Sequence, residues 1–275
     1  MPTRAGPGRT EARRPRLTPQ ALRNRRAWER WARPYEARHR ATLRRGDGLG
    51  WGLWHIPESE LDLLGPVRGK RLLELGCGAA HWSVGLARRG ARVTGLDVSP
   101  RRLAQARSEM ARAGVEFPLV EASAESVPLP SRSFDIVFCD WGAMTFCDPY
   151  RTVPEVARLL RPGGVFAFSN ASVFRSLCQE HRSDRIGTRL RYDYFTLHRI
   201  RYPGEVDFQL PTGEWLRLFR DCGFAVEKMI EPRSPARGRT TYLTAAEARW
   251  GRRWPQEVLW KLRRTGALER PKGRA

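Results

Sequence analysis

Leu72-Leu73-Glu74-Leu75-Gly76-Cys77-Gly78-Ala79-Ala80, followed by Val93-Thr94-Gly95-Leu96-Asp97, is the stretch that decides the fold of this chain. It predicts an apolar strand, a tight glycine turn, a helix over residues 82–89 and a second apolar strand that ends on a carboxylate. Glycines at 76 and 78 let the chain turn sharply and leave its backbone bare for a ligand. Asp97 lies 23 residues after Glu74, where the edge of a parallel sheet would hold a ribose diol.

Two features of this turn separate two classes of cofactor-binding protein. A glycine pair of this kind serves both nicotinamide and S-adenosylmethionine (SAM) proteins, so the pair alone does not discriminate between them. A third glycine is absent because position 82 is Trp, and Glu74 places an acid inside the strand two residues before the first glycine. That strand position is usually apolar in dinucleotide enzymes. With an acid at this position, the sequence resembles the class I SAM-dependent methyltransferases.

Two later segments extend the resemblance. Residues 125–130 (Glu-Ser-Val-Pro-Leu-Pro) lead into the apolar run 133–140, and together they resemble the acidic adenine-edge loop and fourth strand of that family. Residues 159–168 resemble the helix, turn and fifth strand that close the second half of its sheet. The chain is therefore identified as a class I SAM-dependent methyltransferase of the small-molecule, type 11-like kind. The match is close over residues 69–169 and holds only in outline over residues 212–263.

The apolar pattern predicts an α/β fold. We expect a Rossmann-like, seven-stranded, mostly parallel sheet with helices on both faces and a final antiparallel strand. A helix that starts at Thr18-Pro19 precedes the sheet, and Pro34 should bend or end it. Trp28, Trp31 and Tyr35 form a stripe on that helix that predicts core packing. The expected strands cover residues 71–75, 91–96, 117–120, 134–139, 165–168, 224–229 and 257–262.

We expect three regions along the chain. Residues 1–46 form a basic N-terminal extension, a disordered leader followed by a helix, and residues 264–275 form a basic tail. Residues 47–263 form the methyltransferase domain, with a lid insertion at 171–210. Ligands of open α/β sheets sit at the carboxyl ends of the strands. The N-terminal helices and the insertion can both cover that edge, so we expect them to form the acceptor pocket.

The net charge of +21 is concentrated at the two ends of the chain. Residues 1–46 hold 14 arginines against three glutamates, and residues 232–275 hold 12 basic residues against three acidic ones. The middle of the chain is therefore nearly neutral. We interpret the ends as solvated and partly disordered. The alternative is that they bind RNA phosphates, which would make the protein an RNA methyltransferase.

Cysteine usage and hydropathy indicate the cellular compartment that we expect for the protein. The five cysteines show neither a CxxC pair nor a histidine at zinc spacing, so we expect buried, reduced thiols and no metal site. No run of 18 apolar residues is present, so we expect no membrane span. The first 46 residues lack the apolar core of a secretion signal, and the expected location is the cytoplasm.

The resemblance implies SAM as cofactor and assigns the residues that hold it. Glu74 and the backbone of residues 76–78 should face its methionine end, and Asp97 its ribose hydroxyls. The loop at 123–125 should line the adenine, although the family commonly has Asp where Ser123 stands. The expected cofactor-binding residues are Tyr35, Glu74, Gly76, Cys77, Gly78, Asp97, Val98, Ser123, Ala124, Glu125, Asp140 and Trp141.

The reacting methyl should lie beside Asp140 and Trp141. Many small-molecule methyltransferases place a histidine soon after the fourth strand, but residues 140–146 contain none. A general base, if one is needed, is therefore expected at His198 in the insertion, or second at His55. An ordinary hydrogen-bonded histidine is the alternative for each of the two.

These observations predict a methyltransferase that acts on oxygen, nitrogen or carbon of a small organic acceptor. A SAM-binding or dinucleotide-binding module without catalytic activity is the alternative from another class.

Overall fold

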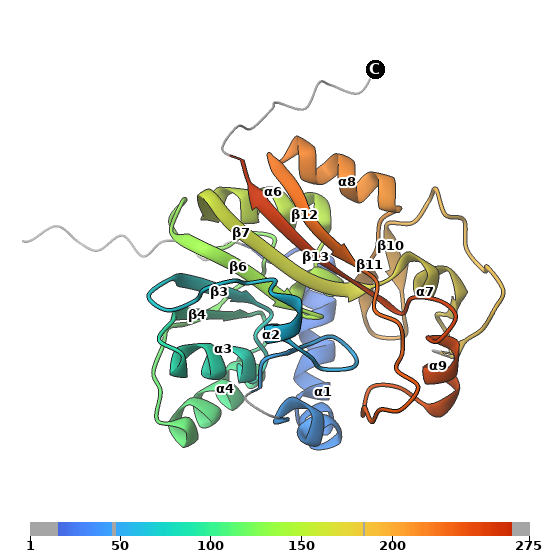
Figure 1. Cartoon of the computed structure of the whole chain (residues 1–275), viewed down its shortest axis with the longest axis horizontal. Helices are drawn as coiled ribbons and strands as arrows, with labels where there is room; N and C mark the ends of the chain where they lie inside the picture. Colours follow the sequence, from blue (N-terminus) through green and yellow to red (C-terminus); the bar gives the residue numbers. More distant parts are fainter. Residues whose placement is uncertain (1–15, 46–47, 184, 266–275) are drawn as a thin grey trace, which may run out of the picture.

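A seven-stranded sheet forms the centre of the molecule (Figure 1). The computed structural model describes residues 16–45, 48–183 and 185–265. The strands are β3 (Arg71–Leu75), β4 (Arg92–Asp97), β5 (Leu119–Glu121), β6 (Phe134–Asp140), β7 (Leu160–Ala171), β12 (Phe224–Ile230) and β13 (Glu257–Arg264). Their order is β12-β13-β7-β6-β3-β4-β5, and β13 runs antiparallel to both of its neighbours. The expected mostly parallel, Rossmann-like sheet is confirmed.

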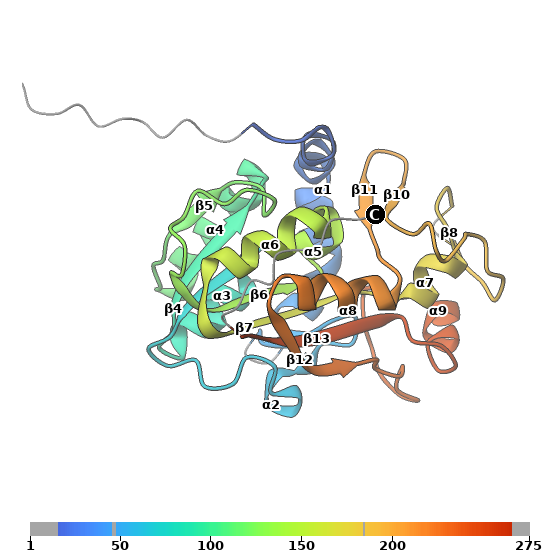
Figure 2. The same ribbon diagram turned by 90° about the horizontal axis from the view of Figure 1, so that it is seen from above.

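Helices cover both faces of this sheet. On one side lie α3 (His81–Arg88) and α4 (Pro100–Ala113), and on the other α6 (Pro149–Leu159) and α8 (Thr212–Asp221) (Figures 1 and 2). The N-terminal helix α1 (Pro19–Leu43) packs against α4. The small elements are β1 (Gly50–Trp51), β2 (Ile56–Pro57), α2 (Glu58–Leu61), α5 (Ala143–Phe146) and α9 (Ala245–Trp250).

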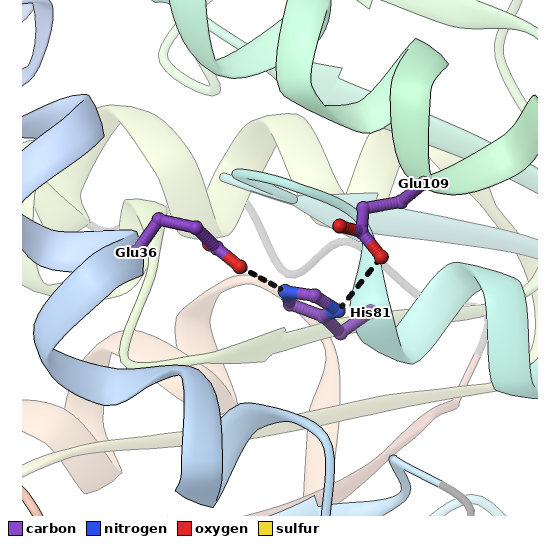
Figure 3. Close-up of side chains that lie close together, drawn as sticks. All are labelled: Glu36, His81 and Glu109. Carbon is purple, nitrogen blue, oxygen red and sulfur yellow. Dashed lines mark hydrogen bonds and ion pairs between the residues drawn. The ribbon is translucent and has the colours of Figure 1, made fainter. Parts of the chain in front are cut away.

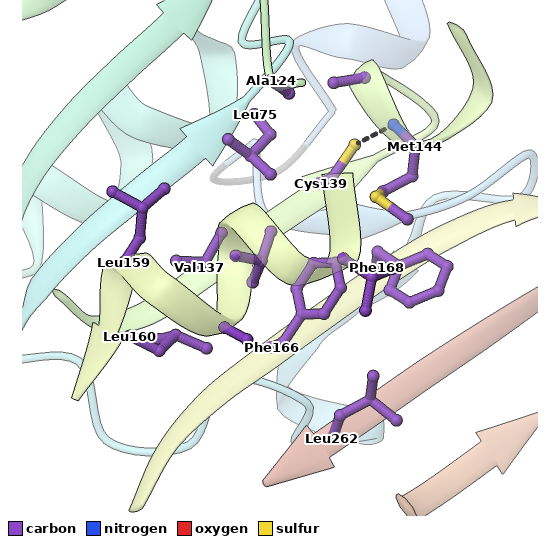
Figure 4. Packing of buried hydrophobic residues seen from close by; sticks show 14 of the residues in the cluster. Leu75, Ala124, Val137, Cys139, Met144, Leu159, Leu160, Phe166, Phe168 and Leu262 are labelled. Atoms are coloured by element: carbon purple, nitrogen blue, oxygen red, sulfur yellow. Dashed lines mark hydrogen bonds between the residues drawn. The ribbon is translucent and has the colours of Figure 1, made fainter. Parts of the chain in front are cut away.

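Alternate residues of each central strand enter two separate apolar clusters, one on each face of the sheet. In β6, Val137 and Cys139 join the cluster beneath α6 and α8, whereas Ile136 and Phe138 join the cluster beneath α3. The stacked rings of β7 belong to the first cluster (Figure 4). Burial on both faces fixes the strands, and with them the positions of the loops at their carboxyl ends.

Local capping residues set the helix boundaries largely as the sequence predicts. Ser99 caps α4 by accepting from the backbone N–H of Arg102 at 3.2 Å, and Asp148 caps α6 through Tyr150 at 3.0 Å. Gly114 ends α4 in the left-handed conformation, with φ +65°. At α8 the N-cap is Pro211, which has no side-chain hydrogen bond to offer.

Helix α1 differs from the expectation at two points. It continues through Pro34 to Leu43, so of the two effects expected of the proline, a bend or an end, the end is wrong. Buried residues on both sides of Pro34 keep one face of the helix against the protein, and this packing outweighs the lost backbone hydrogen bond. The aromatic stripe is also not entirely core, because Trp31 is 56% exposed.

The expected lid insertion, residues 171–210, contains one helix and two small antiparallel ribbons. These elements are α7 (Val173–Cys178), the pair β8 (Gln179–Glu180) and β9 (Arg185–Ile186), and the pair β10 (Arg199–Arg201) and β11 (Val206–Phe208). The ribbons lie beyond the carboxyl ends of β6 and β7 (Figure 2).

All five cysteines are free and buried, as the sequence predicts. Among the described residues, no helix is both long and apolar enough to cross a bilayer. The expected leader and the end of the basic tail, residues 1–15 and 266–275, lie outside the described residues.

Candidate active site

A cavity of about 320 Å³ opens at the carboxyl ends of β3, β4 and β6, beneath α1. Its volume falls in the range of small-molecule sites, roughly 300–1,000 Å³. The twelve residues expected to hold a cofactor come from five separate stretches of the chain, and all but Glu125 line this one cavity. The fold thus brings together residues as distant in sequence as Tyr35 and Trp141.

The glycine turn after β3 forms the floor of the cavity. Gly76 has φ +72°, and a Cβ there would lie 2.5 Å from the backbone nitrogen of Ala143. The N–H groups of Gly76 and Cys77 both donate to the carbonyl of Leu96, at 2.8 and 2.9 Å. Only glycine meets both conditions, the left-handed backbone and the close approach of a second chain segment.

Three carboxyl groups line the cavity, of which those of Glu74 and Asp97 are buried and that of Asp140 is half-buried. Glu74 accepts from the hydroxyl and the backbone N–H of Ser83, and burial raises its pKa to about 8. Asp140 accepts from the Ser169 hydroxyl at 2.5 Å and from the backbone N–H of Gly52 at 2.9 Å, and burial raises its pKa to about 6. A cationic ligand would stabilise the ionised form of these carboxyl groups and lower their raised pKa values.

Asp97 is the third acid, and it connects β4 to the glycine turn. Its two oxygens accept from the backbone N–H groups of Gly78, at 2.9 Å, and of Ser99, at 2.8 Å. Burial raises the pKa of its carboxyl group. Asp97 therefore supports the turn as well as lining the cavity.

The cavity also contains side chains that the sequence reasoning missed. The side chain of Arg102 is only 7% exposed, and its guanidinium lies over the rings of Trp28, at 5.7 Å, and Tyr35, at 5.3 Å. The hydroxyl of Tyr242 lies 3.5 Å from that of Tyr35. Arg102 could have been suspected from its place one turn after the Ser99 cap, but no local pattern marks Tyr242.

Comparison with known proteins agrees with this geometry. The family description "Methyltransferase domain" matches residues 73–168, which span β3 to β7. A SAM-dependent methyltransferase structure from Mesorhizobium loti superposes with a TM-score of 0.61 at 25% identity, over 75% of this chain and 96% of that one. The chain carries a class I SAM-dependent methyltransferase domain.

Curated relatives match this methyltransferase domain over part of their length. An uncharacterized protein of Mycobacterium tuberculosis is 36% identical over 42% of this chain and 45% of its own length. The ubiquinone biosynthesis O-methyltransferase of Azoarcus is 37% identical over 42% of this chain and 56% of its own length. The chain thus spans about half the length of the curated relatives it matches.

The residues present fit the SAM that a methyltransferase domain implies. A Cβ at Gly78 would collide with the guanidinium of Arg102, so the bare glycine turn lets Arg102 lie against it. Buried acids suit the positive sulfonium and ammonium groups, and Arg102 suits a carboxylate. The aromatic walls suit the apolar faces of the adenine.

A histidine that lines this cavity links three helices. His81 of α3 lies between Glu36 of α1 and Glu109 of α4 (Figure 3). Its Nε2 is 3.0 Å from Glu36, and its Nδ1 is 3.8 Å from Glu109. Through these contacts α1 becomes a wall of the cavity, so the helical part of the expected N-terminal extension belongs to the site.

Neither histidine expected as a base lines the cavity. His198 lies on the insertion, 3.1 Å from Asp148, the N-cap of α6, and packs edge-on against Tyr150. His55 lies at an exposed turn, with its Nε2 3.1 Å from the carbonyl of Arg45. The chain around both residues directs them toward hydrogen-bond partners outside the cavity, and their catalytic roles stay predictions.

Glu125 also differs from the other expected cofactor residues. It is buried, but its carboxylate accepts from the hydroxyl of Thr18 at 2.8 Å and from the backbone N–H of Asp148 at 3.0 Å. It connects the start of α1 to the start of α6 and lies outside the cavity. Ser123 and Ala124, from the same expected loop, do line the cavity.

Proposed function

We propose that the protein binds SAM in this cavity and transfers its methyl group to oxygen, nitrogen or carbon of a small organic acceptor. The observation that carries the proposal is the convergence of the Gly76–Gly78 turn with the three acids Glu74, Asp97 and Asp140 in one cavity at the carboxyl edge of the sheet. When bound, SAM supplies a methyl group that is already electrophilic. The protein must then hold SAM, align the acceptor in line with the methyl group and exclude water.

Each part of the cavity has a proposed partner on SAM. The glycine turn and Glu74 hold the methionine end, and Arg102 pairs with its carboxylate. Asp97 accepts from the ribose hydroxyls, with Val98 beside it. Ser123 and Ala124 border the adenine. Trp28 and Tyr35 on α1 close the cavity from above and keep water out.

Asp140 takes the role that neither expected histidine fills. It lines the cavity at the end of β6, and its pKa of about 6 suits a group that accepts a proton near neutral pH. It lies next to Trp141, where the sequence predicts the methyl group. We propose that Asp140 orients the acceptor and takes its proton where the acceptor must lose one.

The relatives support a small acceptor. Besides the ubiquinone biosynthesis enzyme, a fatty-acid O-methyltransferase of Mycolicibacterium smegmatis is 36% identical over 43% of this chain and 42% of its own length. Both names describe transfer to oxygen of an organic molecule. RNA binding by the basic ends stays a prediction, because residues 1–15 and 266–275 lie outside the described residues. The cytoplasmic location also stays a prediction.

Calorimetry and a transfer assay test this function. We expect the purified protein to bind SAM and not NAD or NADP, and to move label from methyl-labelled SAM onto small molecules of a bacterial extract. Binding of SAM without any transfer would favour the module without catalytic activity. Transfer mainly to RNA, suppressed steeply by salt, would favour the RNA methyltransferase instead.

SAM binding is expected to release a proton near neutral pH. With a pKa of about 8, Glu74 is mostly protonated at pH 7 in the ligand-free protein. A bound sulfonium and ammonium favour the carboxylate, so its pKa falls and up to about one proton leaves. The affinity for SAM should therefore rise with pH up to about 8 and then level off.

Calorimetry at pH 7 in two buffers of different ionisation enthalpy measures the proton released. Glu74→Gln is expected to remove most of the release, and S-adenosylhomocysteine, whose sulfur is neutral, should cause less of it. Identical binding heats in the two buffers for the parent protein would show that Glu74 does not titrate with the ligand.

A further inference from the structure

A second cavity, of about 330 Å³, adjoins the first. The insertion forms much of it, through α7 and the ribbon of β10 and β11, and the rest comes from α5 and the end of β7. Trp141 lines both cavities, so the two share a wall at the place where the methyl group is proposed to lie. Trp141 itself has φ +53°, a left-handed conformation that is rare for a bulky residue.

The two cavities differ in character. The walls of the first are mostly apolar, whereas the second is lined by amide, hydroxyl, imidazole, guanidinium and carboxylate groups together with aromatic and aliphatic side chains. A cavity that must accept a long hydrocarbon would have apolar walls throughout. The second cavity therefore favours a small polar occupant.

Asn170 is the decisive residue of the second cavity. It is 1% exposed, and neither its amide oxygen nor its amide nitrogen has a hydrogen-bond partner among the described residues. On α5, the buried hydroxyl of Thr145 is likewise without a partner in the described chain. A buried polar group left in this state costs about 1–3 kcal/mol, so such groups normally await water or a ligand.

Of the two arginines that line this cavity, Arg175 is already paired within the protein. Arg175 donates to Gln256 at 2.6 Å and lies 3.7 Å from the carboxylate of Glu247. The ring of His181 stacks on Tyr192 with centroids 3.8 Å apart. Among the described residues of this cavity, the buried Asn170 amide and the buried Thr145 hydroxyl thus offer open hydrogen-bonding capacity, and both recognise neutral polar groups as well as charged ones.

We propose that this second cavity binds the methyl acceptor, and that the acceptor is a small polar molecule which presents a hydrogen-bond donor and an acceptor side by side to the Asn170 amide. A carboxamide, a carboxylic acid or a hydroxyl next to a carbonyl has this arrangement. Thr145 binds a further polar atom of the same molecule. The proposal rests on the methyltransferase function and adds to it the chemical class of the substrate.

The test uses the full chain, methyl-labelled SAM and two acceptor pools from a bacterial extract, one of water-soluble small molecules and one of lipids. We expect label in the water-soluble products. Asn170→Ala and Thr145→Val are each expected to lower this labelling by about ten-fold or more, because each removes a hydrogen bond to the acceptor. SAM affinity, measured by calorimetry, should stay within about two-fold of the parent.

Thr152→Val is the matched control. Thr152 on α6 is another buried hydroxyl without a partner among the described residues, but it lines neither cavity. The Thr152→Val variant should transfer as much label to water-soluble products as the parent protein does. Because Asn170 makes no side-chain hydrogen bond within the described protein, Asn170→Ala should not lower the midpoint of thermal unfolding, whereas removing a structural residue would.

Label that enters lipids, or water-soluble labelling that Asn170→Ala leaves unchanged, would overturn the proposal while the methyltransferase function stands. A parent protein that fails to bind SAM would overturn the function itself. The calorimetric arm therefore distinguishes the two failures.

Discussion

Replacing Gly76 with alanine is expected to destabilise the protein by about 2–5 kcal/mol and to abolish SAM binding. The left-handed backbone costs a residue with a Cβ about 1–2 kcal/mol. A Cβ at Gly76 would also approach the backbone nitrogen of Ala143 to 2.5 Å, and overpacking of this kind adds roughly 1–3 kcal/mol. Because a backbone and not a flexible side chain opposes it, the turn itself must move, and the floor of the cavity moves with it.

Gly114→Ala is the control for this substitution. Gly114 has φ +65° but nothing within 4 Å of the position its Cβ would take. The Gly114→Ala variant should therefore lose only the stability that the left-handed backbone costs, about 1–2 kcal/mol, and should keep the SAM affinity of the parent. Urea unfolding gives the two free energies, and calorimetry gives the two affinities. Equal losses of stability for the two variants would show that the contact with Ala143 does not constrain the turn.

Replacing Asp97 with alanine is expected to weaken SAM binding by about 1–3 kcal/mol, or roughly 5- to 150-fold. Two charge-assisted hydrogen bonds to the ribose would be lost. The N–H groups of Gly78 and Ser99 would also lose their acceptor, so the turn should loosen. Asp97→Asn keeps the size and one oxygen, and should give a smaller loss.

Asp135→Ala is the matched control on the same sheet. Asp135 lies at the start of β6, at the opposite edge, and accepts from the backbone N–H of Arg71 at 2.8 Å and from Arg161 at 2.9 Å. Its removal should lower stability without changing the affinity for SAM in calorimetric titration. Unchanged affinity in Asp97→Ala would mean that the ribose lies elsewhere in the cavity.

Much of the frame follows from local sequence patterns. Short-range capping explains why α4 starts after Ser99 and ends at Gly114, and why α6 starts after Asp148. The apolar runs of β3, β4 and β6 are buried on both faces and pair in parallel, as the alternation with helices predicts. Carboxyl ends of parallel strands meet at one edge, so the sequence could also bring Glu74, Asp97 and Asp140 to one place.

Side-chain partners contributed from distant segments were not predictable in this way. Glu125 fits the acidic loop of the family, yet it accepts from Thr18, which is 107 residues away in the chain. His198 has the chemistry of a base, yet the insertion directs it to the cap of α6. A short stretch of sequence contains the residue but not its hydrogen-bond partner, which lies far away in the chain. Whether a buried polar group is satisfied depends on that partner.

The sequence by itself determined the order of strands and helices, the glycine turn and the acids at the edge of the sheet, because each depends on backbone conformation and periodicity within a few residues. Only the tertiary structure decided that β13 inserts between β7 and β12, and that Arg102 and Tyr242 line the cavity. It alone buried the Asn170 amide in the second cavity with no hydrogen-bond partner among the described residues. These features arise from packing between segments far apart in the chain, which local propensity does not encode.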